Sequence, residues 1–143
     1  MIARRALSVL MIALGVAAIA IGLSIFLWGA AVTAHITEQL FDRAVGRGGA
    51  PTETFGPIFE SELRFYAPFW IVYGAILVST ARRFPERLGR VPALGALFFA
   101  GGVGRALGWM QAGPPHPAFV MLMVSELTLP LIFLALWALA RRV

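Results

Sequence analysis

The sequence contains no cysteine and no lysine, and charged residues of all kinds make up only 13% of its 143 positions. The absence of cysteine excludes thiol catalysis, disulfide bonds and thiolate metal sites. The shortage of charge, together with 59% hydrophobic residues and a mean hydropathy of +0.83, excludes an ordinary soluble domain. This composition is typical of a protein that lies mostly within a lipid bilayer.

Four runs are long and apolar enough to cross a bilayer, since a spanning helix needs about 20 mostly apolar residues. They lie at about 6–32, 63–80, 91–110 and 118–140. The first run is much longer than the apolar core of a signal peptide, so we predict that it is a retained span. With short connections, the sequence predicts an all-α fold: an integral membrane antiparallel four-helix bundle, forming a single transmembrane domain over residues 1–143.

The segment between the first two runs, residues 34–63, interrupts the apolar pattern with five acids and two arginines. Its apolar residues fall on one helical face, namely Ile36, Leu40, Phe41, Ala44 and Val45. This pattern predicts an amphipathic helix lying in the membrane interface. The residues expected to end it are Gly46, Gly48, Gly49 and Pro51. Whether residues 34–63 cover a site as a lid is left open.

Twelve arginines oppose seven acids, which gives a formal net charge of +5. Eight of the arginines lie at one set of span ends: Arg4, Arg5, Arg82, Arg83, Arg87, Arg90, Arg141 and Arg142. Arg43 and Arg47 are the two in the opposite loop. The positive-inside rule therefore predicts that both termini are cytoplasmic. Because the arginines flank apolar runs and no polar domain accompanies them, we expect no nucleic-acid partner.

Two charged residues lie inside the last two apolar runs, Arg105 in the third and Glu126 in the fourth. Charges at such depth are costly, rare, and usually paired or functional. At about 1.5 Å per residue they lie roughly 8 and 12 Å below the outer end, within reach of each other. Glu62 and Tyr66 share one face of the second span. We therefore predict a ligand-binding site formed by Glu62, Tyr66, Arg105 and Glu126.

Four further residues form a secondary polar set, namely Glu60, Arg64, Tyr73 and Ser125. Arg64 is expected to pair with Glu60 at i, i+4 near the headgroups, away from the face of Tyr66 and Tyr73. Ser125 is expected to bond a backbone carbonyl, because the sequence has no nucleophile-elbow pattern around it. Pro130, four residues after Glu126, removes the hydrogen bond to the Glu126 carbonyl and leaves a second acceptor beside the carboxylate.

The chemistry of the charged group has two interpretations. Two acids facing one arginine would leave an excess negative charge, and repulsion would favour protonating one carboxylate, giving a proton donor. Alternatively, Arg105 and Glu126 form a structural clasp that sets the register of two helices. Catalysis stays open. His35 and His116 lack metal-ligand spacing, so we expect neither a metal nor a cofactor.

Small residues recur every seven positions along the first span, at Ser8, Gly15, Gly22 and Gly29. Such a seam allows another helix backbone to approach closely. It suggests a second function, that of a non-enzymatic accessory or assembly subunit that packs on a larger membrane complex or forms a homo-oligomer. The first function remains binding of a small amphipathic or lipid-like ligand in the outer leaflet. In both cases the lipid bilayer is a partner.

Three stretches resemble a known family: ELRFYAPFWIVYGA, GGVGRALGWMQAGPPHP and the SEL of the fourth span. Over roughly residues 55–135 the chain resembles small bacterial membrane proteins of the domain of unknown function 4345 family. The resemblance implies a four-span bacterial inner-membrane protein in which Glu62, Arg64, Arg105 and Glu126 match recurring charged positions. It implies no established activity. A looser likeness, in architecture alone, is to DoxX-like four-span proteins, some of which are linked to quinone or sulfur redox chemistry.

Overall fold

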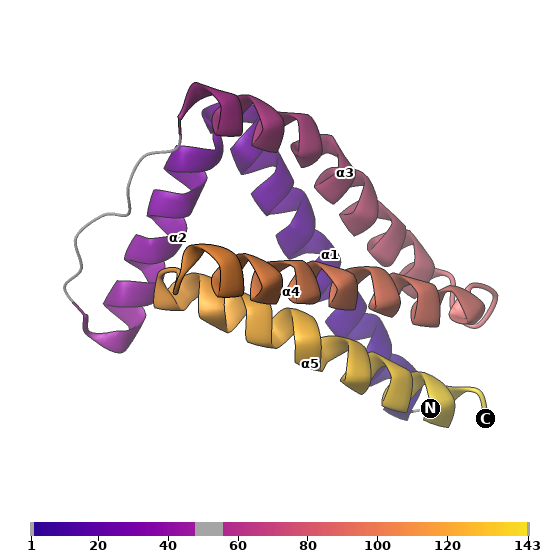
Figure 1. The fold of residues 1–143 in the computed structure, drawn as a ribbon. Helices are drawn as coiled ribbons and strands as arrows, with labels where there is room; N and C mark the ends of the chain where they lie inside the picture. The colour runs from indigo at the N-terminus through magenta and orange to yellow at the C-terminus, as the bar shows by residue number, and fades with distance from the viewer. Residues whose placement is uncertain (1, 48–55, 143) are drawn as a thin grey trace. The chain divides into compact units, whose positions relative to one another are not determined.

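A computed structural model describes residues 2–47 and 56–142, and these residues are helical apart from short connections. The helices are α1 (Ile2–Trp28), α2 (Ala30–Val45), α3 (Pro57–Arg82), α4 (Val91–Ala112) and α5 (Pro117–Ala140), with a 3-10 turn, η1 (Leu88–Arg90), before α4 (Figure 1). By length and composition α1, α3, α5 and the joined η1–α4 can each cross a membrane. The predicted fold class, all-α with four apolar spans, is confirmed.

The chain divides into two compact units. The first unit joins residues 1–13 to residues 77–143, and the second is residues 14–76. The helices α1 and α3 each contribute one part to either unit. The single transmembrane domain over residues 1–143 stays a prediction.

The first unit is built on a hairpin in which α4 and α5 run antiparallel (Figure 1). Its turn is non-helical over residues 113–116, as the prolines and glycine of this stretch predict. Gly113 adopts a φ of 93°, and the Nδ1 atom of His116 accepts a hydrogen bond from the Ala118 N–H at 3.3 Å. Pro117 begins α5, where its missing N–H removes no helix hydrogen bond. The turn sequence therefore sets both helix ends.

The start of α1 is tied to the ends of α3 and α5 in the first unit. Arg4 Nε donates to the carbonyl oxygen of Ala140 at 3.2 Å, and Ser8 Oγ donates to that of Ala81 at 3.3 Å. The largest side chains buried in this unit are Phe133, Leu7, Met11, Leu77 and Val91. Packing of such side chains stabilises the unit through dispersion, since lipid is as apolar as the side chains themselves. The arginine-bearing helix ends therefore gather at one end of the unit.

The second unit packs α1 against α3 through small residues. Positions seven residues apart meet in reverse order: Gly15 with Gly74, Gly22 with Ala67, and Gly29 with Glu60. A Cβ added at Gly74 would collide with the carbonyl oxygen of Gly15, and one at Gly22 would lie 2.9 Å from that of Ala67. The two backbones are therefore in contact. The close approach stabilises the pair by dispersion, which is the main attraction between helices in lipid.

The seam predicted along the first span is thus occupied by α3. In the second unit its glycines contact α3, and in the first unit Ser8 bonds Ala81, which lies one further step of seven along α3. The accessory-subunit hypothesis named this seam as the surface for an outside partner. Because the chain uses the seam internally, that hypothesis loses the feature on which it rested.

The first apolar run is broken within its length. The sequence predicted one span over 6–32, but α1 ends at Trp28 and α2 begins at Ala30. Gly29 lies between them with φ 98° and ψ 163°, a backbone conformation that side chains with a Cβ rarely adopt. The helix predicted from residue 34 therefore starts four residues earlier, at Ala30. Gly46, with φ 69°, caps its end, while Gly48, Gly49 and Pro51 lie outside the described residues.

The second span begins in the polar segment that precedes its apolar run. We predicted a start near Leu63, whereas α3 starts at Pro57 and runs to Arg82. Proline suits the first position of a helix, and the acid Glu60 in the first turn interacts favourably with the helix dipole. Pro68 consequently lies inside the helix, well beyond its first turn.

Candidate functional site

The structure brings Arg105 of α4 and Glu126 of α5 together. Arg105 Nε donates to both carboxylate oxygens, at 2.8 Å to Oε2 and 3.0 Å to Oε1. The Glu126 side chain is 4% exposed and that of Arg105 is 35% exposed. Hydrogen bonds between two ionised groups are roughly twice as strong as neutral ones. The buried carboxylate therefore has its counter-charge, and the guanidinium reaches from it toward the surface of the hairpin.

Glycines of α4 make room for this ion pair. A Cβ at Gly102 would lie 3.0 Å from the Cβ of Glu126, so the α4 backbone lies close against α5 at this point. A Cβ at Gly101 would lie 3.9 Å from Glu126 Oε2, an ordinary contact. Around Gly104 and Gly108 no described atom lies within 4 Å of the Cβ position, apart from the nearby backbone of α4 and the adjacent residues. Gly102 thus serves packing, whereas Gly104 and Gly108 leave open space along the helix that carries Arg105.

The terminal amino groups of the Arg105 guanidinium do not bind Glu126. An arginine side chain carries five N–H donors, and Glu126 engages the one on Nε. Over residues 2–47 and 56–142, no hydrogen bond or ion pair involves the terminal amino groups of Arg105. Unsatisfied donors are costly away from water. These groups are the part of the pair that is available to an external acceptor.

The hydroxyl groups next to Glu126 are satisfied by their own helix. Ser125 Oγ donates to the carbonyl oxygen of Leu122 at 2.7 Å, as predicted, and Thr128 Oγ1 donates to that of Val124 at 2.8 Å. Pro130 is buried within α5, and a Cβ at Gly95 of α4 would lie 3.8 Å from it. The Glu126 carbonyl has no N–H partner at Pro130, because proline lacks a backbone N–H.

The remaining residues of the predicted site belong to the second unit. Glu62 and Tyr66 lie at exposed positions of α3, and the Tyr66 ring contacts Phe65 edge-on at 5.4 Å between centroids. Tyr73, one of the secondary set, is buried. Arg105 and Glu126 are in the first unit. A site shared by all four residues therefore stays a prediction.

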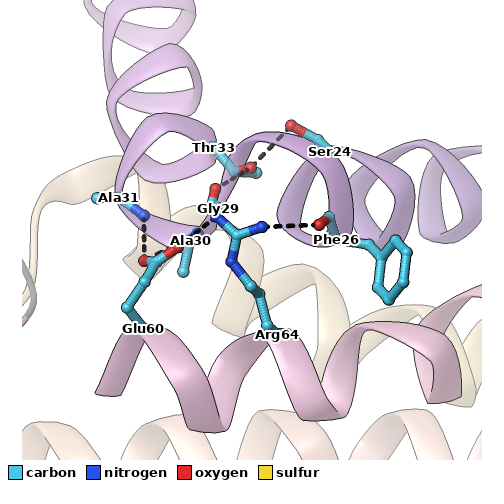
Figure 2. A network of polar contacts seen from close by, with 8 residues as sticks. All are labelled: Ser24, Phe26, Gly29, Ala30, Ala31, Thr33, Glu60 and Arg64. Atoms are coloured by element: carbon cyan, nitrogen blue, oxygen red, sulfur yellow. Dashed lines mark hydrogen bonds and ion pairs between the residues drawn. The ribbon is translucent and has the colours of Figure 1, made fainter. Parts of the chain in front are cut away.

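A second polar cluster joins α3 to the break between α1 and α2 (Figure 2). Glu60 and Arg64 form the predicted i, i+4 pair at 3.3 Å. The Glu60 carboxylate also accepts from the backbone N–H of Ala30, at 3.0 and 3.1 Å, and from that of Ala31 at 3.2 Å. Arg64 Nη1 donates to the carbonyl oxygen of Phe26 at 2.9 Å. Each charge therefore binds the helix end that it complements.

The electrostatics of the break explain this arrangement. The end of α1 exposes carbonyls with partial negative charge, and the start of α2 exposes N–H groups with partial positive charge. Arg64 neutralises the first and Glu60 the second. Thr33 and Ser24 complete the junction, since Thr33 Oγ1 donates to the Gly29 carbonyl at 2.8 Å and lies 2.7 Å from Ser24 Oγ (Figure 2). The pair that we placed in a secondary role thus stabilises a helix break.

Sequence reasoning missed this junction, although a signal was present. Glu60, Ala67, Gly74 and Ala81 are spaced by seven along α3, in the same step as the small residues of α1. Matching the two series in antiparallel order would have paired Gly29 with Glu60. Hydropathy alone could not reveal the break, because one glycine among apolar residues lowers the mean hydropathy of the run very little.

The described parts of the chain, residues 2–47 and 56–142, contain no group of three His, Asp or Glu side chains that could hold a metal ion. His35 Nε2 lies 2.8 Å from Gln39 Nε2, and His116 caps α5. Each histidine therefore has a role within its own helix.

Four helices that are long and apolar enough to cross a membrane, with a charged pair that joins the last two, fit a small multi-pass membrane protein. The chain belongs to the family described as Domain of unknown function (DUF4345), whose model matches residues 6–138. No curated protein and no solved structure matches the chain. The family resemblance is thus confirmed over more of the chain than the motifs covered, and the likeness to DoxX-like proteins has no support from these comparisons.

Proposed function

We propose that the α4–α5 hairpin binds a small amphipathic or lipid-like molecule and that Arg105 holds a carbonyl or anionic group of this ligand. The observation that carries the proposal is the geometry of the ion pair: Glu126 is bound by Nε alone. The terminal amino groups then form a fork that suits a carbonyl, carboxylate or phosphate oxygen. The open space at Gly104 and Gly108 supports access from the side.

Glu126 positions Arg105 in this proposal. Its carboxylate fixes the guanidinium, so that the outward donors are oriented before a ligand arrives, which lowers the ordering cost of binding. The ion pair is neutral overall, so a carbonyl ligand adds no net charge. An anionic ligand would add one negative charge in a low-dielectric place, which is costly, so the pair suits a neutral carbonyl group best.

The test is recovery of bound small molecules from the full-length protein after mild detergent extraction, by mass spectrometry. We expect about one molecule per chain from the wild type and at least about 10-fold less from R105L/E126L. The Arg105 guanidinium and the Glu126 carboxylate that orients it are expected to contribute at least about 1.4 kcal/mol to the binding free energy. The matched control is E60L/R64L, which removes the other ion pair and should keep the ligand. Equal recovery from wild type and R105L/E126L would rule the proposal out.

We further propose a bacterial inner-membrane location with both termini in the cytoplasm. The gathering of eight arginines at one end of the first unit supports this orientation. Single cysteines introduced at Arg87 and at Thr52, which lies outside the described residues, are expected to react with an impermeant thiol reagent from opposite faces of the membrane. Labelling of both from the same face would contradict the orientation.

A further inference from the structure

A cavity of about 230 Å³ lies at the arginine-bearing end of the first unit, far from the ion pair of the hairpin in sequence and in helix position. It is a shallow hollow, largely open to its surroundings, and is lined by Arg4, Arg5, Ser8, Ala81, Phe84 and Pro85. The first turns of α1 provide two guanidinium groups, and the last turn of α3 with the chain after it provides an apolar wall. The lining is therefore cationic on one side and apolar on the other.

The two arginines of the cavity differ in how they are held. Arg4 donates through Nε to the Ala140 carbonyl, which fixes its guanidinium and leaves the terminal amino groups available. Arg5 is exposed, and no hydrogen bond or ion pair of it is found in the part of the chain that the structure describes. The cavity thus presents one fixed and one adaptable cation.

Positive charge is crowded around this cavity. The same end of the unit carries six more arginines, at 82, 83, 87, 90, 141 and 142, and Glu86 is the acid among them. Burial lowers the pKa of Arg87, the positive charges of Arg83 and Arg90 lower it further, and Glu86 opposes them. Two of these charges are already engaged: Arg87 donates to Ser79 Oγ, and the Arg141 guanidinium lies 4.2 Å from the centre of the Trp137 ring. An anion in the cavity would relieve the repulsion.

We infer that this cavity binds the phosphodiester headgroup of an anionic phospholipid. Arg4 and Arg5 bind the phosphate oxygens through charge-assisted hydrogen bonds. Phe84, Pro85 and Ala81 contact the glycerol and the first methylene groups of the acyl chains. Basic cavities between the cytoplasmic ends of membrane helices bind anionic lipid headgroups by the same physics.

The phosphate chemistry alone would also suit free inorganic phosphate, and two features favour the lipid. The cavity lies at the first turns of one span and just beyond the last turn of another, which is the level of the headgroups in a bilayer. A small hydrated anion makes no apolar contact with Ala81, Phe84 and Pro85, whereas the acyl side of a lipid buries apolar surface against them.

The test compares phosphatidylglycerol with phosphatidylcholine of identical acyl chains, by native mass spectrometry of the full-length protein in detergent micelles. We expect the wild type to prefer phosphatidylglycerol and R4Q/R5Q to lose affinity for it by about 25-fold, which corresponds to about 1 kcal/mol for each arginine. The matched control is R43Q/R47Q, which removes the same charge from α2 and the residues after it and should keep the preference. Thermal unfolding of each variant verifies the fold, and R5Q alone, at an exposed position, replaces the double variant if that one does not fold.

Three results would overturn the inference. Equal binding of the two lipids by the wild type would remove the headgroup specificity. Equal loss in R43Q/R47Q and R4Q/R5Q would show that affinity follows net charge and not the cavity. Displacement of phosphatidylglycerol by millimolar inorganic phosphate, with the same thermal stabilisation from phosphate alone, would assign the cavity to a free anion.

Discussion

The R105L variant is expected to lose about 3–5 kcal/mol of unfolding free energy, because it leaves the Glu126 carboxylate buried without its counter-charge. E126L should cost less, since the Arg105 side chain is 35% exposed and can move toward a more polar environment, whereas that of Glu126 is 4% exposed. R105L/E126L should recover most of the stability, because no unpaired charge remains. Unfolding in mixed micelles, followed by circular dichroism, measures all three.

The Glu60–Arg64 pair provides the matched control for this cycle. Its side chains are 26% and 43% exposed, so R64L should cost only about 1–2 kcal/mol, from a half-exposed ion pair and one backbone hydrogen bond. If R105L costs no more than R64L, or if R105L/E126L is as unstable as the sum of its single variants, Arg105 and Glu126 do not act as a coupled buried pair.

The second large effect is expected at the seam between α1 and α3. G74A should destabilise the protein by about 3 kcal/mol, at the upper end of the usual range for overpacking. Its added methyl group meets the Gly15 carbonyl and the backbone N of Ile19, the latter at 3.0 Å. Backbone atoms cannot turn aside as a flexible side chain can, so the two helices must separate. The unfolding midpoint in micelles measures the loss.

The control for the seam is G108A, on the open side of α4. Apart from the adjacent residues and the nearby backbone of α4, no described atom lies within 4 Å of the new methyl group, and alanine favours a helix over glycine by about 0.5–1 kcal/mol. G108A should therefore be neutral or slightly stabilising. Similar losses for G74A and G108A would indicate a general intolerance of helix substitutions and would contradict the tight seam.

Hydropathy and charge were sufficient to predict the fold class and the residues of the ion pair. The spans are apolar because the bilayer excludes unsatisfied polar groups, so a count of apolar residues finds them. A charge inside such a run needs a partner at similar depth, so Arg105 and Glu126 could be matched by their positions along the two helices. The spans and the ion pair can both be predicted from the positions of residues along the chain alone.

The sequence did not reveal the helix break at Gly29 or the pairing of α1 with α3. The first depends on backbone conformation, and the second depends on which helix packs against the small residues of α1. Gly29 was read as part of a seam, but its positive φ breaks the helix. Its neighbours required a capping acid and a cation from another helix, which Glu60 and Arg64 provide. The seam on α1 predicts a close helix partner but does not identify it, and the partner is α3, which carries a matching series at the same spacing of seven residues. Contacts between α1 and α3 determine both the groups that stabilise the break at Gly29 and the partner of the seam.

We propose that Arg105 binds a ligand with the terminal amino groups that Glu126 leaves unused. The most direct measurement is the amount of small molecule recovered per folded chain from the wild type and from R105K. Lysine keeps a positive charge for Glu126 but lacks the planar fork of terminal amino groups. We predict that R105K folds and retains at least about 10-fold less of the molecule, a difference of about 1.4 kcal/mol. Recovery of the same amount from R105K, or of none from the wild type, would contradict ligand binding by Arg105 and leave the pair as a structural clasp.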